Sequence, residues 1–223
     1  MIYTFWEGPM PGYIKLCLDT WRQEFTLLNY NNMNNYTNLD IKALQNYTLA
    51  QISDVVRVHI LRDNGGYWVD ADTIMLTDYL PEENMIGMSA DRTAHCGYLH
   101  FDKNSIMLKE WAEKQDAIIS LGRTGKWDLF ANSLSEPLVK KYDEVIIKDR
   151  QLYFPESYMS IEDNPYFQYR DFYFDSHYQL SDIKLTELLM LHNSWTPPWY
   201  KELSEIEVLS KTRTMSNILK EVL

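Results

Sequence analysis

Apolar and polar residues follow two periods along this chain, and the two periods predict helices and strands in turn. Apolar positions three and four residues apart predict amphipathic helices over 12–24 and 49–61. Short apolar runs predict strands at 2–6 and 25–29, and a third run, 67–69, follows the turn Gly65-Gly66. Between them, residues 29–38 are rich in Asn and predict a surface loop. The later pattern predicts further elements at 85–88, 98–101, 105–115, 145–147 and 188–191, and a helix over about the last 20 residues.

The alternation of helices and strands from residue 2 to residue 72 predicts the fold class. Such alternation is typical of an α/β sheet with a parallel core. With 223 residues, the chain can bury one substantial core, and neither an internal repeat nor a linker-like stretch divides it. We therefore expect one α/β domain over residues 1–223, with a mixed, mostly parallel sheet flanked by helices.

Composition and charge exclude several classes of partner. The net charge of −11 argues against sequence-independent binding of nucleic acid and against adsorption to anionic lipid. No apolar run approaches the ~18 residues of a membrane span, and the first residues lack the basic start of a secretion signal. The cysteines, Cys17 and Cys96, lack metal-ligand spacing and fit a reducing compartment. These features predict a soluble, cytoplasmic protein.

The most informative segment runs from Gly65 to Asp72, where a short apolar strand ends in two carboxylates one residue apart. Side chains alternate across a strand, so Asp70 and Asp72 are expected to point to the same side as the strand ends. Two carboxylates in one small space repel unless a hard cation or several hydrogen-bond donors lie between them. The same Asp-x-Asp spacing alone is equally typical of an acidic turn after an edge strand.

Three further pieces accompany this pair. Ser53-Asp54-x-x-Arg57 sets a carboxylate and a guanidinium one helical turn apart, just before the strand. Trp6 closes the first strand, and His192-Asn193-Ser194-Trp195 follows a late apolar run. Taken singly, these are typical of a surface ion pair, a structural histidine and core aromatics. These motifs indicate a function only because all of them occur in one chain and in a fixed order.

Together these pieces resemble the GT-A glycosyltransferases of family 32, which include bacterial capsule transferases and are distantly related to clostridial glucosylating toxins. The matching motifs are, in chain order, Ile2…Trp6-Glu7-Gly8, Ser53-Asp54…Arg57, Gly65-Gly66-Tyr67-Trp68-Val69-Asp70-Ala71-Asp72 and His192-Asn193-Ser194-Trp195. The sequence departs from the commonest pattern in the order of Tyr67 and Trp68 and in a shorter spacing from His to Trp. The second departure leaves open which of His192, Asn193 and Ser194 is the late metal ligand.

The resemblance implies a GT-A, Rossmann-like fold and a set of site residues. Asp70, Asp72 and Arg57 would be catalytic, and Asp70, Asp72 and His192 would bind a metal ion. Carboxylate, imidazole and water suit Mn²⁺ better than Mg²⁺, so Mn²⁺ is the expected cofactor and Mg²⁺ the alternative. The residues that would bind the nucleotide sugar are Trp6, Ser53, Asp54, Arg57, Asp70, Ser194 and Trp195.

The resemblance also implies an activity and a place of action. The enzyme would move a hexose from a nucleotide sugar, a UDP-sugar by expectation, to a saccharide acceptor with retention of configuration. The acceptor would be a lipid-linked intermediate of a bacterial capsular polysaccharide, reached at the inner face of the membrane. A C-terminal helix carrying Lys211, Arg213 and Lys220 could touch that membrane, although a solvated polar face explains these residues as well.

Two other functions compete with this interpretation. Asp70-Ala71-Asp72-Thr73 matches the nucleophile motif of haloacid-dehalogenase-type phosphatases, with Asp70 as nucleophile and Asp72 as general acid. That class also needs a late acidic pair at a strand end, which the sequence does not offer. A non-catalytic carbohydrate-binding protein would explain the high aromatic content of 14%. It would not need paired carboxylates at the end of a strand.

Overall fold

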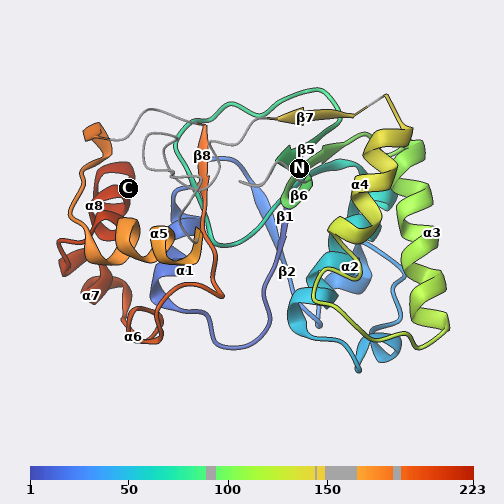
Figure 1. Ribbon diagram of the computed structural model, residues 1–223, viewed down its shortest axis with the longest axis horizontal. Helices are drawn as coiled ribbons and strands as arrows, with labels where there is room; N and C mark the ends of the chain where they lie inside the picture. The colour runs from blue at the N-terminus through green and yellow to red at the C-terminus, as the bar shows by residue number, and fades with distance from the viewer. Residues whose placement is uncertain (89–93, 144, 149–164, 183–186) are drawn as a thin grey trace. The chain divides into compact units, whose positions relative to one another are not determined.

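The computed structural model of the chain describes residues 1–88, 94–143, 145–148, 165–182 and 187–223 (Figure 1). Contacts divide the chain into two compact units, each of which is described by itself. Unit 1 comprises Met1–Glu7, Glu24–Asp70 and Leu80–Asp149. Unit 2 comprises Gly8–Gln23, Ala71–Tyr79 and Arg150–Leu223. The expectation of one domain over residues 1–223 stays a prediction.

Unit 1 is built on a six-stranded sheet with the order β2-β1-β3-β6-β5-β7. β1 pairs with β2 and β3 in parallel, and β5 pairs with β7 in parallel, whereas β6 runs antiparallel to β3 and β5. The mixed sheet with its parallel pairs confirms the predicted α/β class. The strands are β1 (Ile2–Phe5), β2 (Phe25–Leu28), β3 (Gly66–Val69), β5 (Met85–Met88), β6 (Ala94–Phe101) and β7 (Ile146–Lys148).

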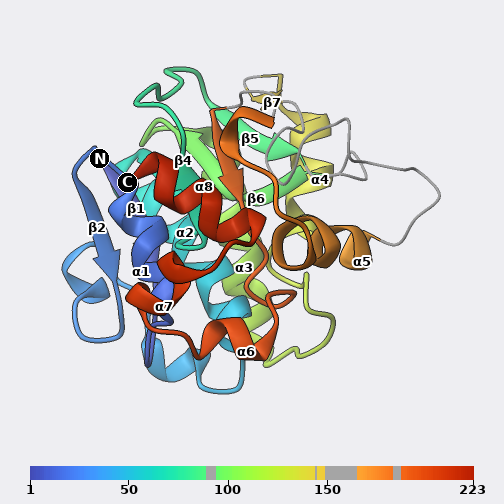
Figure 2. The same ribbon diagram turned by 90° about the vertical axis from the view of Figure 1, so that its left-hand side faces the viewer.

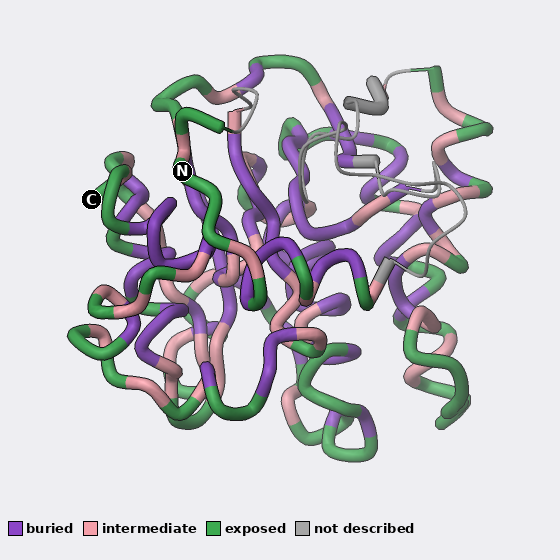
Figure 3. The backbone as a smooth tube through the Cα atoms, turned by 60° about the vertical axis from the view of Figure 1, so that its left-hand side comes forward, coloured by how far each residue is buried: buried purple, intermediate pink, exposed green. Residues whose placement is uncertain are grey.

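Three helices pack beside this sheet, and Figure 1 shows them gathered together on one side of the strands. They are α2 (Leu49–Asn64), α3 (Ile106–Ser120) and α4 (Asn132–Lys141). α2 begins at Thr48, whose side chain accepts a hydrogen bond from the Gln51 N–H in a capping box. Its apolar face joins the core formed with β1, β3 and β6, of which β1 and β6 are buried almost throughout (Figure 3).

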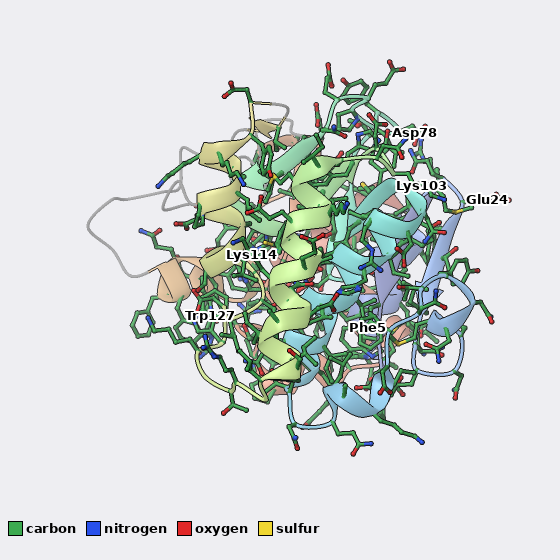
Figure 4. All side chains as sticks on the ribbon, turned by 90° about the vertical axis from the view of Figure 1, so that its right-hand side faces the viewer. Phe5, Glu24, Asp78, Lys103, Lys114 and Trp127 are labelled. Atoms are coloured by element: carbon green, nitrogen blue, oxygen red, sulfur yellow. The ribbon has the colours of Figure 1, made fainter. Side chains whose placement is uncertain are left out.

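The outer side of unit 1 carries a few exposed apolar side chains, of which Trp127 is the most exposed. Lys114 lies on α3, and Trp127 follows in the loop before α4, where its ring points away from the ribbon (Figure 4). Trp127 is 77% exposed. Two 3-10 turns, Met33–Asn35 and Ile41–Leu44, fill the connection from β2 to α2, part of which the sequence predicted to be a loop.

Unit 2 surrounds a two-stranded antiparallel sheet of β4 (Thr73–Met75) and β8 (Leu188–Met190). α1 packs on β4 and on α7, and α7 packs on α8, as Figure 2 shows. A π-helical turn, Asp171–Asp175, continues α5 and contacts α8. The helices are α1 (Gly12–Asp19), α5 (Pro165–Arg170), α6 (Pro198–Lys201), α7 (Glu205–Ser210) and α8 (Thr214–Val222).

The C-terminal helix α8 is shorter than predicted, and two of the three basic residues near it donate to backbone carbonyls. Arg213 donates to the backbone carbonyl of Asp175, and Lys220 donates to that of Lys211. Among the described residues, no helix is long and apolar enough to span a membrane. Cys17 and Cys96 are both buried, and both are free thiols.

Most predicted elements are present, and the predicted helices differ from the observed ones mainly in the residue at which they end. The helix predicted over 12–24 ends at Asp19, and the helix predicted over 49–61 continues to Asn64 before Gly65 ends it. The sequence pattern missed β4 and the helices α4 to α6, because each is short or lacks a clear apolar period.

Candidate functional site

The Gly65-Gly66 turn fixes the start of the motif strand. Both glycines have positive φ, 70° and 99°, a region that other residues rarely adopt. A Cβ on Gly66 would lie 2.5 Å from the carbonyl oxygen of Met1, and one on Gly65 would lie 2.7 Å from the backbone nitrogen of Lys103. The turn therefore requires glycine at both positions. It lets β3 enter the sheet beside β1, with Tyr67 N–H donating to the Met1 carbonyl at 3.0 Å.

The two motif carboxylates lie in a turn and not on a strand. β3 ends at Val69, and Asp70 and Ala71 separate it from Asp72, after which β4 begins at Thr73. The expectation that strand alternation points both carboxylates to one side therefore does not apply here. Asp70 belongs to unit 1, where its N–H donates to the Gly97 carbonyl at 2.8 Å. Asp72 belongs to unit 2, where its carbonyl accepts from the Leu191 N–H at 2.9 Å.

In unit 1, Arg57 joins two carboxylates. Its Nη2 lies 3.1 Å from Asp54 Oδ1 and 3.2 Å from Asp70 Oδ1. The side chains of Arg57, Asp54 and Asp70 are 7%, 11% and 25% exposed. The predicted sharing of one helical face by Asp54 and Arg57 is confirmed, and the ion pair is buried, which removes the interpretation as a surface pair. Ser53 contributes its carbonyl and its hydroxyl, 3.4 Å from Nε and 3.2 Å from Nη2.

Trp68 supports the same cluster, although the sequence analysis gave it no role. The Arg57 guanidinium carbon lies 5.2 Å from the centre of the Trp68 ring, a cation–π contact. The Trp68 indole N–H donates to Asp70 Oδ1 at 2.8 Å. The signal that would have found this contact is the spacing of Trp68 and Asp70, two residues apart along an extended chain.

Asp70 has one carboxylate oxygen left for a ligand. Both of its side-chain contacts, from Trp68 and Arg57, go to Oδ1. Oδ2 accepts no hydrogen bond and makes no ion pair with any residue in the described part of the chain. A quarter of the side chain is exposed. One oxygen is thus fixed by the protein while the other can meet a cation or a donor group.

Burial makes Asp54 a carboxyl group that titrates near neutral pH. Burial raises its pKa from the usual 3.8 to about 7, against the lowering effect of the Arg57 charge. The charges of Asp70 and Asp128 raise the pKa further. The nearby Cys96 thiol is also buried, which raises its pKa to about 12 and keeps it uncharged. Of the two carboxyl groups that contact Arg57, Asp54 therefore takes up a proton within the physiological range.

Trp6 lies at the same edge of the sheet as Asp70. β1 and β3 are parallel, with Tyr3 opposite Trp68, so that Trp6 and Asp70 follow the carboxyl ends of adjacent strands. Trp6 is half-buried, and its N–H donates to the Leu28 carbonyl at 3.0 Å. The carboxyl edge of a parallel sheet is where α/β proteins bind ligands.

In unit 2, the late motif lies beside Asp72. β8 pairs with β4, with Met190 opposite Thr73, and not with a strand of the six-stranded sheet. The backbone N–H of Asn193 donates to Asp72 Oδ2 at 2.7 Å. The Asn193 side-chain oxygen accepts from the Tyr13 hydroxyl at 2.6 Å. Three segments, separated by up to 180 residues, thus converge on one carboxylate.

His192 and Trp195 form a stacked pair on a tyrosine. Their rings lie 4.0 Å apart at an interplanar angle of 30°. Tyr169 packs edge-on against both rings, and its hydroxyl accepts from the His192 N–H at 3.0 Å. The Trp195 indole N–H donates to no described residue, and Ser194 is exposed. Tyr13 and Tyr169 were both missed by the sequence analysis, because nothing local marks either as a neighbour of the motif.

A metal ion must be judged from the donor atoms that these residues offer. In the described ranges, no group of three or more His, Cys, Asp or Glu is arranged to hold one. Asp70 Oδ2 and the Asp72 carboxylate are oxygen donors of the kind that Mg²⁺ and Mn²⁺ accept. Each unit thus contributes one carboxylate of this kind.

The sequence was compared with known proteins. Residues 1–148 match a family model described as capsular polysaccharide synthesis protein, which confirms the resemblance to capsule-synthesis proteins. Among proteins with curated descriptions, none matches. A solved structure named PaToxG glycosyltransferase is similar with a TM-score of 0.48 at 13% identity, over 63% of this chain and 67% of that chain. A structure of an active-site mutant of LgtC is similar with a TM-score of 0.41 at 12% identity, over 90% and 92%.

Proposed function

Because this chain belongs to the family of capsular polysaccharide synthesis proteins, we propose that it transfers a hexose from a nucleotide sugar to a saccharide acceptor. In this reaction the bond from the anomeric carbon to the diphosphate breaks, the acceptor oxygen bonds to that carbon, and the acceptor loses its proton. The proposed donor is a UDP-hexose, and configuration is retained. The proposed acceptor is a lipid-linked saccharide at the cytoplasmic face of a bacterial membrane.

One observation carries the proposal: the buried Arg57 that links Asp54 to Asp70 behind the Gly65-Gly66 turn. A buried guanidinium costs free energy to desolvate, and two carboxylates together with Ser53 compensate it here. Such a cluster is more than core packing requires, because an apolar set would fill the same space with less cost. It leaves Asp70 Oδ2 directed by its neighbours and available to a ligand.

We assign the remaining residues the following roles. Asp54 accepts a hydrogen bond from a sugar hydroxyl when ionised, or keeps Arg57 in place. Trp6 offers a ring face for the base at the carboxyl edge of β1. Trp195 offers its indole N–H, and Ser194 its exposed hydroxyl, to phosphate oxygens.

Asp70, Asp72 and His192 would hold a divalent cation, by preference Mn²⁺, which when bound offsets the charge of the leaving diphosphate. Contacts within the protein fix both carboxylates, whether or not a cation is bound. Trp68 and Arg57 fix Asp70, and the Asn193 N–H fixes Asp72. The enzyme would therefore be a metal-dependent glycosyltransferase of the GT-A kind.

Thermal unfolding with a panel of nucleotide sugars tests the proposal. UDP-, GDP- and CDP-hexoses would be added at saturating concentration with MnCl₂, with MgCl₂ and with EDTA. A ligand at 100 times its Kd stabilises the fold by about 2.7 kcal/mol, so one nucleotide class should raise Tm by several degrees, and only with metal. The Asp72→Asn variant is the matched control.

Two outcomes would contradict the proposal. If no nucleotide sugar raises Tm with any metal, the protein does not bind such donors. Release of phosphate from a generic phosphate ester, lost in Asp70→Asn, would instead favour the phosphatase that the Asp-x-Asp-x-Thr pattern also fits.

A further inference from the structure

Tyr13 is a buried residue that belongs to none of the sequence motifs, yet its hydroxyl reaches one of them. α1 begins at Gly12, where a Cβ would lie 2.6 Å from the Leu203 carbonyl oxygen, so this close approach requires glycine. The next residue, Tyr13, is fully buried and packs against Tyr200 with ring centres 5.8 Å apart. Its hydroxyl lies 2.6 Å from the Asn193 side-chain oxygen.

The hydroxyl of Tyr13 can only serve as a donor toward Asn193 if it stays protonated. Burial raises the pKa of Tyr13 well above 10, and the negative charge of Asp72 raises it further. The hydroxyl is therefore protonated at neutral pH. A protonated phenol that donates to an amide selects the oxygen of that amide and turns the NH₂ group to the other side.

The NH₂ group of Asn193 has no acceptor among the described residues. Asn193 is only half-buried, so this group can meet a ligand. Its backbone N–H already donates to Asp72 Oδ2 at 2.7 Å, which places the amide next to the carboxylate proposed to act at the diphosphate. Its oxygen is directed at Tyr13 and not at a metal ion, which leaves His192 and Ser194 for the late ligand role.

We infer that Asn193 donates a hydrogen bond from its side-chain NH₂ group to a diphosphate oxygen of the nucleotide, and that Tyr13 is the positioning residue that orients this amide. The inference rests on the proposed function. An N–H donor that meets an anionic oxygen forms a charge-assisted bond, about twice as strong as a neutral one. Fixing the donor in advance avoids the cost of ordering the amide when the ligand binds.

Calorimetric titration of UDP in the presence of MnCl₂ tests both parts. Asn193→Asp keeps the size of the side chain and an acceptor for Tyr13 but replaces the NH₂ donor with an oxygen. We expect it to weaken UDP binding roughly 10- to 100-fold, the range of a hydrogen bond to a charged group. Tyr13→Phe removes only the hydroxyl and should weaken UDP binding roughly 3- to 10-fold, because the amide is present but no longer oriented.

Tyr200→Phe is the matched control for Tyr13→Phe. Tyr200 is equally buried and packs against Tyr13, but its hydroxyl bonds to Ser216 Oγ at 2.9 Å and not to the motif. It should leave UDP affinity unchanged. Urea denaturation of each variant separates loss of stability from loss of binding.

The double variant Tyr13→Phe/Asn193→Asp measures whether Tyr13 acts through Asn193. If it does, the double variant binds UDP as weakly as Asn193→Asp alone. Losses that multiply would overturn the positioning role, and unchanged affinity in a folded Asn193→Asp would overturn the binding role. If Tyr13→Phe fails to fold, Asn193→Asp still decides the binding role, and Asn193→Ala decides whether the hydroxyl matters to stability alone. A wild-type protein that binds no UDP but binds GDP or CDP moves the test to that nucleotide; binding none rejects the proposed function itself.

Discussion

In unit 1, Asp70 is held by a charged partner, whereas in unit 2 Asp72 accepts a hydrogen bond from a neutral backbone N–H. The Arg57 guanidinium comes from a helix that precedes the strand by a few residues. The Asn193 N–H comes from a residue 121 positions after Asp72. The hydroxyl of Tyr13, near the start of the chain, in turn donates to the Asn193 side-chain oxygen. Asp70 and Asp72, separated by one residue in the chain, are thus held by different kinds of interaction. We refer to the contacts of Asp70 in unit 1 as the charged half and to the contacts of Asp72 in unit 2 as the neutral half.

The two kinds of interaction should respond differently to amino-acid substitution. A buried ion pair is expensive to break, because the remaining charge is left without compensation, at about 3–5 kcal/mol. A hydrogen bond between neutral groups contributes about 1 kcal/mol, and its loss is felt mainly as misplacement. We therefore expect substitutions in unit 1 to affect stability and activity together, and those in unit 2 to separate the two.

The largest effect is expected from the carboxylates themselves. Asp72→Asn should lower transfer by on the order of 10³-fold with little loss of fold, because a neutral amide cannot replace a charged ligand. Asp70→Asn should be nearly as severe and should also lower stability, since Arg57 loses a partner. Transfer from UDP-hexose at saturating MnCl₂ and urea denaturation provide the measurements. An Asp72→Asn enzyme with near wild-type turnover would contradict the metal role.

Arg57→Lys tests the charged half next. The lysine keeps the charge but loses the planar fork that contacts Asp54, Asp70 and Ser53 together, so kcat/KM should fall by about 10²-fold. Arg62→Lys is the matched control, because Arg62 on the same helix forms its ion pair among the described residues with its neighbour Asp63 and not with the motif. Equal kinetics in the two variants would return Arg57 to a purely structural role.

His192→Ala tests the neutral half. If the imidazole binds the cation, the Kd of Mn²⁺ in the presence of UDP should rise roughly 10-fold or more, while the free energy of unfolding changes less. Loss of the ring also removes its stack on Trp195, so the stability of the variant must be measured in parallel. Unchanged Mn²⁺ affinity would move the ligand role to Ser194, and Ser194→Ala would then show the loss.

The pH dependence of stability should distinguish the two halves as well. Burial raises the pKa of Asp54 to about 7, so the folded protein holds a proton there that the unfolded chain releases. The contribution of Asp54 to stability is therefore complete below pH about 4 and is lost as the pH rises through 7, by up to a few kcal/mol. Urea denaturation between pH 5 and 8 should show this fall in the wild type and not in Asp54→Asn. An equal slope in both proteins would mean that Asp54 does not carry this proton.

The smallest effect is expected from Trp195→Phe. The substitution keeps a ring to stack on His192 and removes the indole N–H proposed to meet a phosphate oxygen. Transfer should slow by roughly 10-fold while Mn²⁺ affinity stays the same. A variant that loses metal affinity instead would show that the ring acts by holding His192.

The sequence determined the parts of this protein that depend on neighbours in the chain. Asp54 and Arg57 share a helical face because they are three residues apart, and two glycines are needed wherever the backbone takes two positive φ angles in a row. Alternating helices and strands likewise gave the α/β class, since amphipathic periods reflect one buried face. The match to the capsular polysaccharide synthesis family covers residues 1–148, a range that includes the Asp54–Arg57 pair and both glycines.

Only the tertiary structure decided how the late motif is held. The pairing of β8 with β4 and the contact of Tyr13 with Asn193 join residues 113 to 180 positions apart, and the place of Asp70 and Asp72 in a turn depends on where β3 ends. No local period encodes such contacts, because many pairings of short apolar segments bury similar area and the packing of the whole unit selects one. The Asp54–Arg57 pair could be predicted from spacing, whereas the contacts that Asp70 makes with Arg57 and Trp68, and all contacts of the neutral half, required the fold.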